Sequence, residues 1–107
     1  MALDFCISTE QRKAEVEPPV LSLSENMHVQ LFLRTNELRR LPQLERMSDF
    51  YDDVSYEGKS LVALLHELQQ VIPSFIARPQ MQATLRSLEQ LCQTALAQGK
   101  NVYGFCD

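Results

Sequence analysis

The densest group of chemically active side chains lies between Glu45 and Asp53, where acidic and aromatic residues share a short stretch. At about 100° per residue, a helix over this stretch places Glu45, Asp49, Asp52 and Asp53 on one side and the apolar residues on the other. Two of these aspartates fall near the expected C-terminus of the helix, where the helix dipole opposes negative charge. Because local stability does not account for them, the pattern indicates an exposed acidic face used for binding.

Aromatic residues accompany this acidic face and are of the type that anchors protein interfaces. Carboxylates raise the association rate with a basic partner, and aromatic contacts slow its dissociation. We therefore predict a docking surface for another protein, made of Glu45, Asp49, Phe50, Tyr51, Asp52, Asp53 and Tyr56. Two simpler interpretations stay open: a solvated helix face, and capping of the next helix by Asp52 or Asp53.

The same carboxylates do not have the spacing of a metal site. The sequence has no D-x-D-x-D-G loop, and side chains that radiate from a helix do not wrap around an ion. The three glycines, Gly58, Gly99 and Gly104, form no phosphate-binding loop. The sequence therefore predicts no metal and no cofactor.

Histidine and cysteine supply the alternative of a small enzyme. We predict that His28 and His66 are exposed beside the apolar stripes of two helices, and neither belongs to a GxSxG or HExxH motif. Cys6, Cys92 and Cys106 include no CxxC pair and are predicted to be buried free thiols. The alternatives are a Cys6–Cys106 disulfide between neighbouring strands, and a Cys92–His66 or Cys6–His28 dyad in an enzyme.

The overall charge argues against nucleic acid and anionic lipid as partners. Fourteen acidic residues exceed ten basic ones, which gives a formal charge of -4. Arg34, Arg39 and Arg40 are interpreted as ion-pair partners or a solvated corner. The first residues lack a signal peptide's positive leader and apolar stretch, and no run approaches membrane-spanning length. We expect a cytoplasmic protein with no nucleic-acid or membrane partner.

Strand-like segments lie at both ends of the sequence, at Leu3 to Ser8 and Asn101 to Cys106. Polar residues from Thr9 to Glu17 predict a turn or exposed edge, the prolines at 18 and 19 exclude a helix there, and Val20 to Leu23 is a short strand or an extended lead-in. Because a lone strand cannot satisfy its own backbone, we expect the two end strands to pair.

Four helices are predicted between these strands. They run from a cap at Ser22 or Ser24 to about Leu38, from Pro42 to Val54, from Ser55–Gly58 to Pro73, and from Pro79 to a cap at Gly99. The third is the clearest, because Leu61, Leu64, Leu65, Leu68, Val71 and Ile72 follow helical spacing. The predicted fold class is α+β: one mostly helical domain, 1–107, with about four helices packed on a small sheet formed by the N-terminal and C-terminal strands.

The sequence resembles a loose group of small bacterial immunity-type proteins of contact-dependent or polymorphic toxin systems. The matching features are the N-terminal strand, Leu21–Ser24 leading to His28 and Phe32, the Asp49–Asp53 centre, Leu61 to Leu68 with Glu67, and a terminal strand ending in Asp107. The resemblance implies a non-enzymatic protein that neutralises a toxin by binding it. Immunity proteins of several folds use acidic, aromatic-bearing surfaces against basic nuclease toxins.

These observations predict a non-enzymatic protein-binding module, with a basic toxin domain as the specific partner. A small enzyme with a Cys- or His-based pocket is the first alternative. The second is a regulatory homodimer that associates through apolar residues such as Phe32 or Phe75.

Overall fold

The computed structural model describes residues 2–32, 38, 40–49 and 52–106, and it has the predicted α+β class. The strands are β1 (Ala2–Ser8), β2 (Leu21–Ser24), β3 (Val54–Tyr56) and β4 (Asn101–Cys106). The helices are α1 (Gln11–Ala14), α2 (Glu25–Phe32), α3 (Pro42–Glu45), α4 (Lys59–Val71) and α5 (Pro79–Gln98), with a 3-10 helix at Ile72–Phe75.

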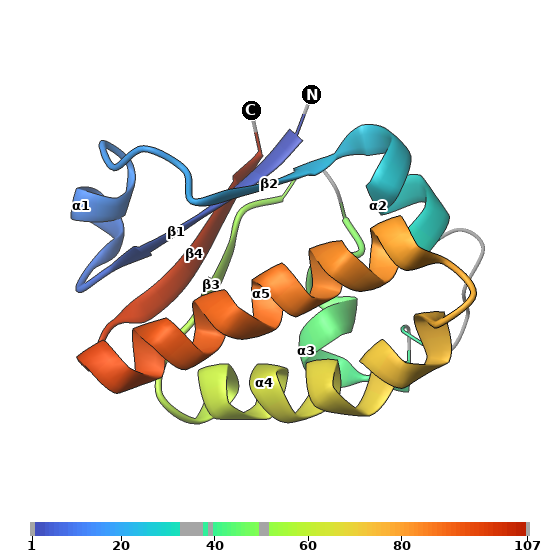
Figure 1. Cartoon of the computed structure of the whole chain (residues 1–107). Helices are drawn as coiled ribbons and strands as arrows, with labels where there is room; N and C mark the ends of the chain where they lie inside the picture. The colour runs from blue at the N-terminus through green and yellow to red at the C-terminus, as the bar shows by residue number, and fades with distance from the viewer. Residues whose placement is uncertain (1, 33–37, 39, 50–51, 107) are drawn as a thin grey trace.

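The sheet has the order β2-β1-β4-β3 with antiparallel pairing throughout (Figure 1). The two chain ends pair at its centre, where Phe5 of β1 lies opposite Gly104 of β4 and Cys6 lies opposite Tyr103. The predicted pairing of the end strands is therefore confirmed. Val20 to Leu23, predicted as a strand or a lead-in, corresponds to β2.

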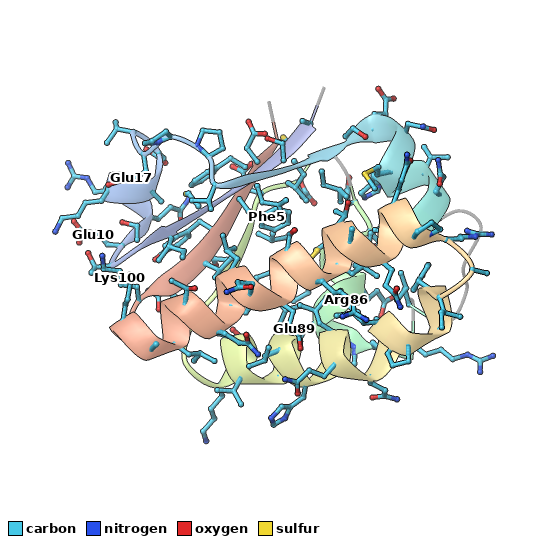
Figure 2. All side chains as sticks on the ribbon, in the orientation of Figure 1. Phe5, Glu10, Glu17, Arg86, Glu89 and Lys100 are labelled. Carbon is cyan, nitrogen blue, oxygen red and sulfur yellow. The ribbon has the colours of Figure 1, made fainter. Side chains whose placement is uncertain are left out.

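One face of the sheet is covered by the two long helices, α4 and α5, which lie side by side (Figure 1). Alternate strand residues, including Leu3, Phe5 and Val102, are fully buried in this layer. Figure 2 shows Phe5 between the sheet and α5. The apolar residues predicted at helical spacing in α4 belong to the same core, as do Met81, Leu85 and Leu88 of α5, and Gly99 ends α5 with φ 66.

Two predicted boundaries are wrong. Thr9 to Glu17 contains the short helix α1, whose Ala14 is buried. The helix predicted from Pro42 to Val54 ends at Glu45, and Val54 begins an edge strand instead. For the first helix, Ser24 is the cap, since its Oγ accepts the backbone N–H of Met27 at 3.3 Å. That helix is described as far as Phe32, because 33–37 lie outside the described residues.

Candidate protein-binding face

The outer face of the sheet, opposite α4 and α5, has its own small apolar cluster. Cys6 and Tyr103 face each other across β1 and β4, and Ala14 of α1 packs on them. The Cys6 thiol donates a hydrogen bond to the Ala14 carbonyl at 3.5 Å. The ring of Phe105 lies nearly parallel to that of Tyr103, with centroids 6.3 Å apart, and is only partly buried. This face therefore presents an aromatic surface that α1 covers in part.

A groove of about 440 Å³ lies on this outer face, and we call it the acidic groove. Its lining residues come from both central strands, the α1–β2 connection and the residue before β3: Asp4, Cys6, Ala14, Glu15, Glu17, Pro19, Asp53, Phe105 and Cys106. Four are carboxylates, and no lysine, arginine or histidine belongs to the lining in the described part of the chain. Figure 2 shows Glu17 beside α1. The groove thus combines a partly exposed aromatic ring with uncompensated negative charge.

Burial and nearby carboxylates both raise the pKa values of the two thiols in the groove. Burial raises the pKa of Cys6, and the nearby Glu17 carboxylate raises it further. Burial also raises the pKa of Cys106, with Asp53 as the second cause. The carboxylates are the second cause of each shift, and they disfavour a thiolate beside them as they would any other anion.

Comparison with known proteins gave no match to a protein family model, to a curated protein or to a solved structure.

The predicted acidic helix face does not exist, because the helix stops at Glu45. Glu45, Asp49, Asp52 and Asp53 are all exposed, but the last three follow the helix, with Asp49 and Asp52 in a turn and Asp53 immediately before β3. The physical reason is the composition: serine and aspartate are poor helix formers, and aspartates at a helix C-terminus oppose the dipole. Helix α3 therefore ends at Glu45, before the three aspartates.

The structure divides the predicted aspartates between two places. Asp53 lines the acidic groove, and its Oδ1 accepts the Cys106 backbone N–H at 3.0 Å. Asp49 and Asp52 lie in one turn, with the Asp52 N–H donating to the Asp49 carbonyl at 3.2 Å. The negative charge of Asp49 raises the pKa of Asp52, as does a side-chain hydrogen bond between them. Glu45 is exposed and is not part of the groove lining.

Tyr56 was predicted to bind a partner, but in the structure its side chain has a packing role. Its side chain is fully buried, and its hydroxyl donates to the Gln43 carbonyl at 2.6 Å. The Arg46 guanidinium lies 4.6 Å from its ring centroid. Tyr56 therefore holds α3 in place and presents no surface to a partner. Phe50 and Tyr51, also predicted as binding residues, lie outside the described residues.

The histidines and cysteines differ in how far they are buried. His66 is exposed as predicted, but His28 is buried, contrary to the prediction, and its Nε2 lies 2.7 Å from the Met47 carbonyl, to which it can donate. All three cysteines are thiols and not half-cystines; Cys6 and Cys92 are buried as predicted, whereas Cys106 is only half-buried. Burial raises the pKa of Cys92 to about 12. Thiols with raised pKa values are poor nucleophiles at neutral pH, which disfavours the cysteine enzyme.

The predicted homodimer contacts are not on the surface. Phe32 and Phe75 are buried and cannot form an interface with a second copy. No described group of three His, Cys, Asp or Glu side chains has the arrangement of a metal site. Within the described ranges, no helix is both long and apolar enough to cross a bilayer.

Sequence reasoning missed most of the groove: Asp4, Glu15, Glu17 and Phe105 were not singled out. A signal for two of them exists, because Asp4 and Phe105 alternate with core residues along their strands and so must point to the outer face. Glu15 and Glu17 carried no such signal, since their position depends on how the α1–β2 connection folds back over the sheet.

Proposed function

We propose that this chain is a non-enzymatic protein-binding module that receives a basic segment of another protein in the acidic groove. The observation that supports it most is the lining of the groove, in which four carboxylates surround a partly exposed phenylalanine ring without a cationic side chain among the described lining residues. A lysine or arginine side chain suits this lining, because it can pair with carboxylates and place its charge over an aromatic ring.

The partner class follows from the same chemistry. The resemblance to immunity-type proteins suggests a basic toxin domain, whose charge would complement the groove, with Asp49 and Asp52 beside it as further steering charges. Binding without catalysis is sufficient for such a role. The raised pKa values of the three thiols also favour binding over thiol chemistry.

The direct test compares two doubly substituted proteins of equal charge. Asp53→Asn with Glu17→Gln alters the groove, whereas Glu25→Gln with Glu45→Gln alters exposed carboxylates outside its lining. The probes are an oligo-arginine peptide and an oligo-glutamate peptide of equal length, titrated by calorimetry at several salt concentrations. We expect the groove variant to bind oligo-arginine about tenfold more weakly, with a smaller salt dependence. The control variant should stay within about twofold, and oligo-glutamate should not bind.

An equal loss in both variants would mean that net charge, rather than the groove, attracts the peptide, and the proposal would fail. Phe105→Leu separates the aromatic contribution, because it keeps every carboxylate. It should weaken binding about two- to fivefold, mainly through faster dissociation.

A further inference from the structure

The two edge strands of the sheet are not equivalent. At β3, the Arg46 Nη2 donates to the Ser55 carbonyl at 2.6 Å and so occupies a backbone acceptor of that strand. At β2, the terminal strand on the other side, no described strand pairs on the side away from β1. An open strand edge is a template for pairing with another chain.

An uncharged groove of about 290 Å³ lies where β1 and the start of β2 meet α5. It is lined by Ile7, Val20, Leu21, Ser87, Gln90, Leu91 and Thr94, and none of these residues carries a charge. Val20, immediately before β2, is 66% exposed although it is apolar. A basic segment finds no carboxylate in this groove, and its mix of apolar and uncharged polar side chains favours an uncharged segment as the occupant.

We propose that β2 pairs antiparallel with β2 of a second copy of this chain, with the two-fold axis passing through Ser22. In this register Leu21 lies opposite Leu23 of the second copy, and Ser22 lies opposite its own counterpart. The leucines of both copies then stay on the helix side of the joined sheet, and the serines stay on the outer side.

Charge and chain direction both suit this pairing. Glu25, the first acidic residue after β2, falls opposite Pro19, so no two carboxylates face each other across the axis. The prolines at 18 and 19 have no N–H to donate, which stops the ladder from extending beyond Val20. Because the contact uses the same strand in both copies, it closes as a dimer instead of growing into a filament. The acidic groove lies on the outer face and stays open in each copy.

Sedimentation equilibrium over a range of protein concentrations tests the proposal. The mass should rise with concentration from 12.3 kDa toward twice that value. Ser22→Lys places two ammonium groups opposite each other at the axis and should raise the dimer dissociation constant about tenfold or more. Gln93→Lys adds the same charge to an exposed position of α5 outside the groove lining and should leave that constant within about twofold.

Mixing Ser22→Lys with Ser22→Glu should restore association, because opposite charges then meet at the axis, and each variant should show the thermal transition of a folded chain. A chain that stays at 12.3 kDa at every concentration overturns the proposal. So does a dimer that Ser22→Lys and Gln93→Lys weaken equally, or β2 amides protected from exchange only when a foreign protein is added. Because the Ser22 hydroxyl donates to Asp4 Oδ1 at 2.6 Å and Asp4 lines the acidic groove, oligo-arginine titration of each Ser22 variant separates a change in the groove from a change in dimerisation.

Discussion

At the scale of single residues, Glu67 shows how a buried charge can have a structural reason. It projects from α4 into the core region, and its carboxylate accepts the backbone N–H groups of Gln43 and Leu44 at 2.9 to 3.1 Å. These amides belong to the first turn of α3, whose N–H groups have no partner within the helix. A helix of four residues, Pro42–Glu45, is thus fixed by a cap supplied from a distant part of the chain.

Replacing Glu67 by alanine should destabilise the protein by about 2 to 4 kcal/mol, since it leaves two amides without their charged acceptor in a largely buried place. Urea unfolding followed by circular dichroism measures this. Gln69→Ala, at an exposed position of the same helix, should change the free energy of unfolding by less than about 0.5 kcal/mol. Equal losses in the two variants would show that the cap contributes nothing.

At the scale of elements, the sequence was informative wherever one period persisted. The leucines of α4 and the apolar positions of α5 marked one helix face each, whereas loose alternation marked β1 and strand-favouring residue types marked β4. Prediction failed between Pro42 and Tyr56, where Leu44, Met47 and Val54 have helical spacing but reach the core from a helix, a turn and a strand. Contacts that the pattern does not contain hold this segment: Glu67 and His28 bind backbone groups 23 and 19 residues away, and Arg46 binds the Ser55 carbonyl nine residues away.

The register of β3, β4 and β1 depends on Gly104, which lies opposite both Phe5 and Val54. A Cβ at Gly104 would lie 2.9 Å from side-chain carbons of both residues. Gly104→Ala should therefore cost about 1 to 3 kcal/mol in chemical denaturation. Val54→Ala introduced together with it removes one of the two clashes, so the double variant should lose less stability than the sum of the single losses. Simple additivity of the two losses would contradict this packing.

At the scale of the whole molecule, the titration of buried groups sets how stability responds to pH. The Cys92 pKa is raised by burial from 9.0 to about 12, and burial raises the pKa of Tyr56 as well. For each group the unfolded chain releases its proton at a lower pH than the folded chain does. The folded state therefore retains more protons at alkaline pH, and stability must fall as the pH rises.

The contribution of the protonated Cys92 thiol to the free energy of unfolding is fully present below about pH 9 and is lost between about pH 9 and 12, by up to about 1.4 kcal/mol per pH unit. Urea titrations at successive pH values measure the slope. Cys92→Ala lowers stability at neutral pH because it leaves a small cavity. Its slope above pH 9 should nevertheless be shallower, because the Cys92 thiol no longer titrates. A slope remains, since Tyr56 and the other thiols are still present. The slope is the decisive quantity, because a cavity alone shifts the whole curve without changing its dependence on pH. An unchanged slope would mean that the Cys92 thiol ionises as readily in the folded protein as in the unfolded chain.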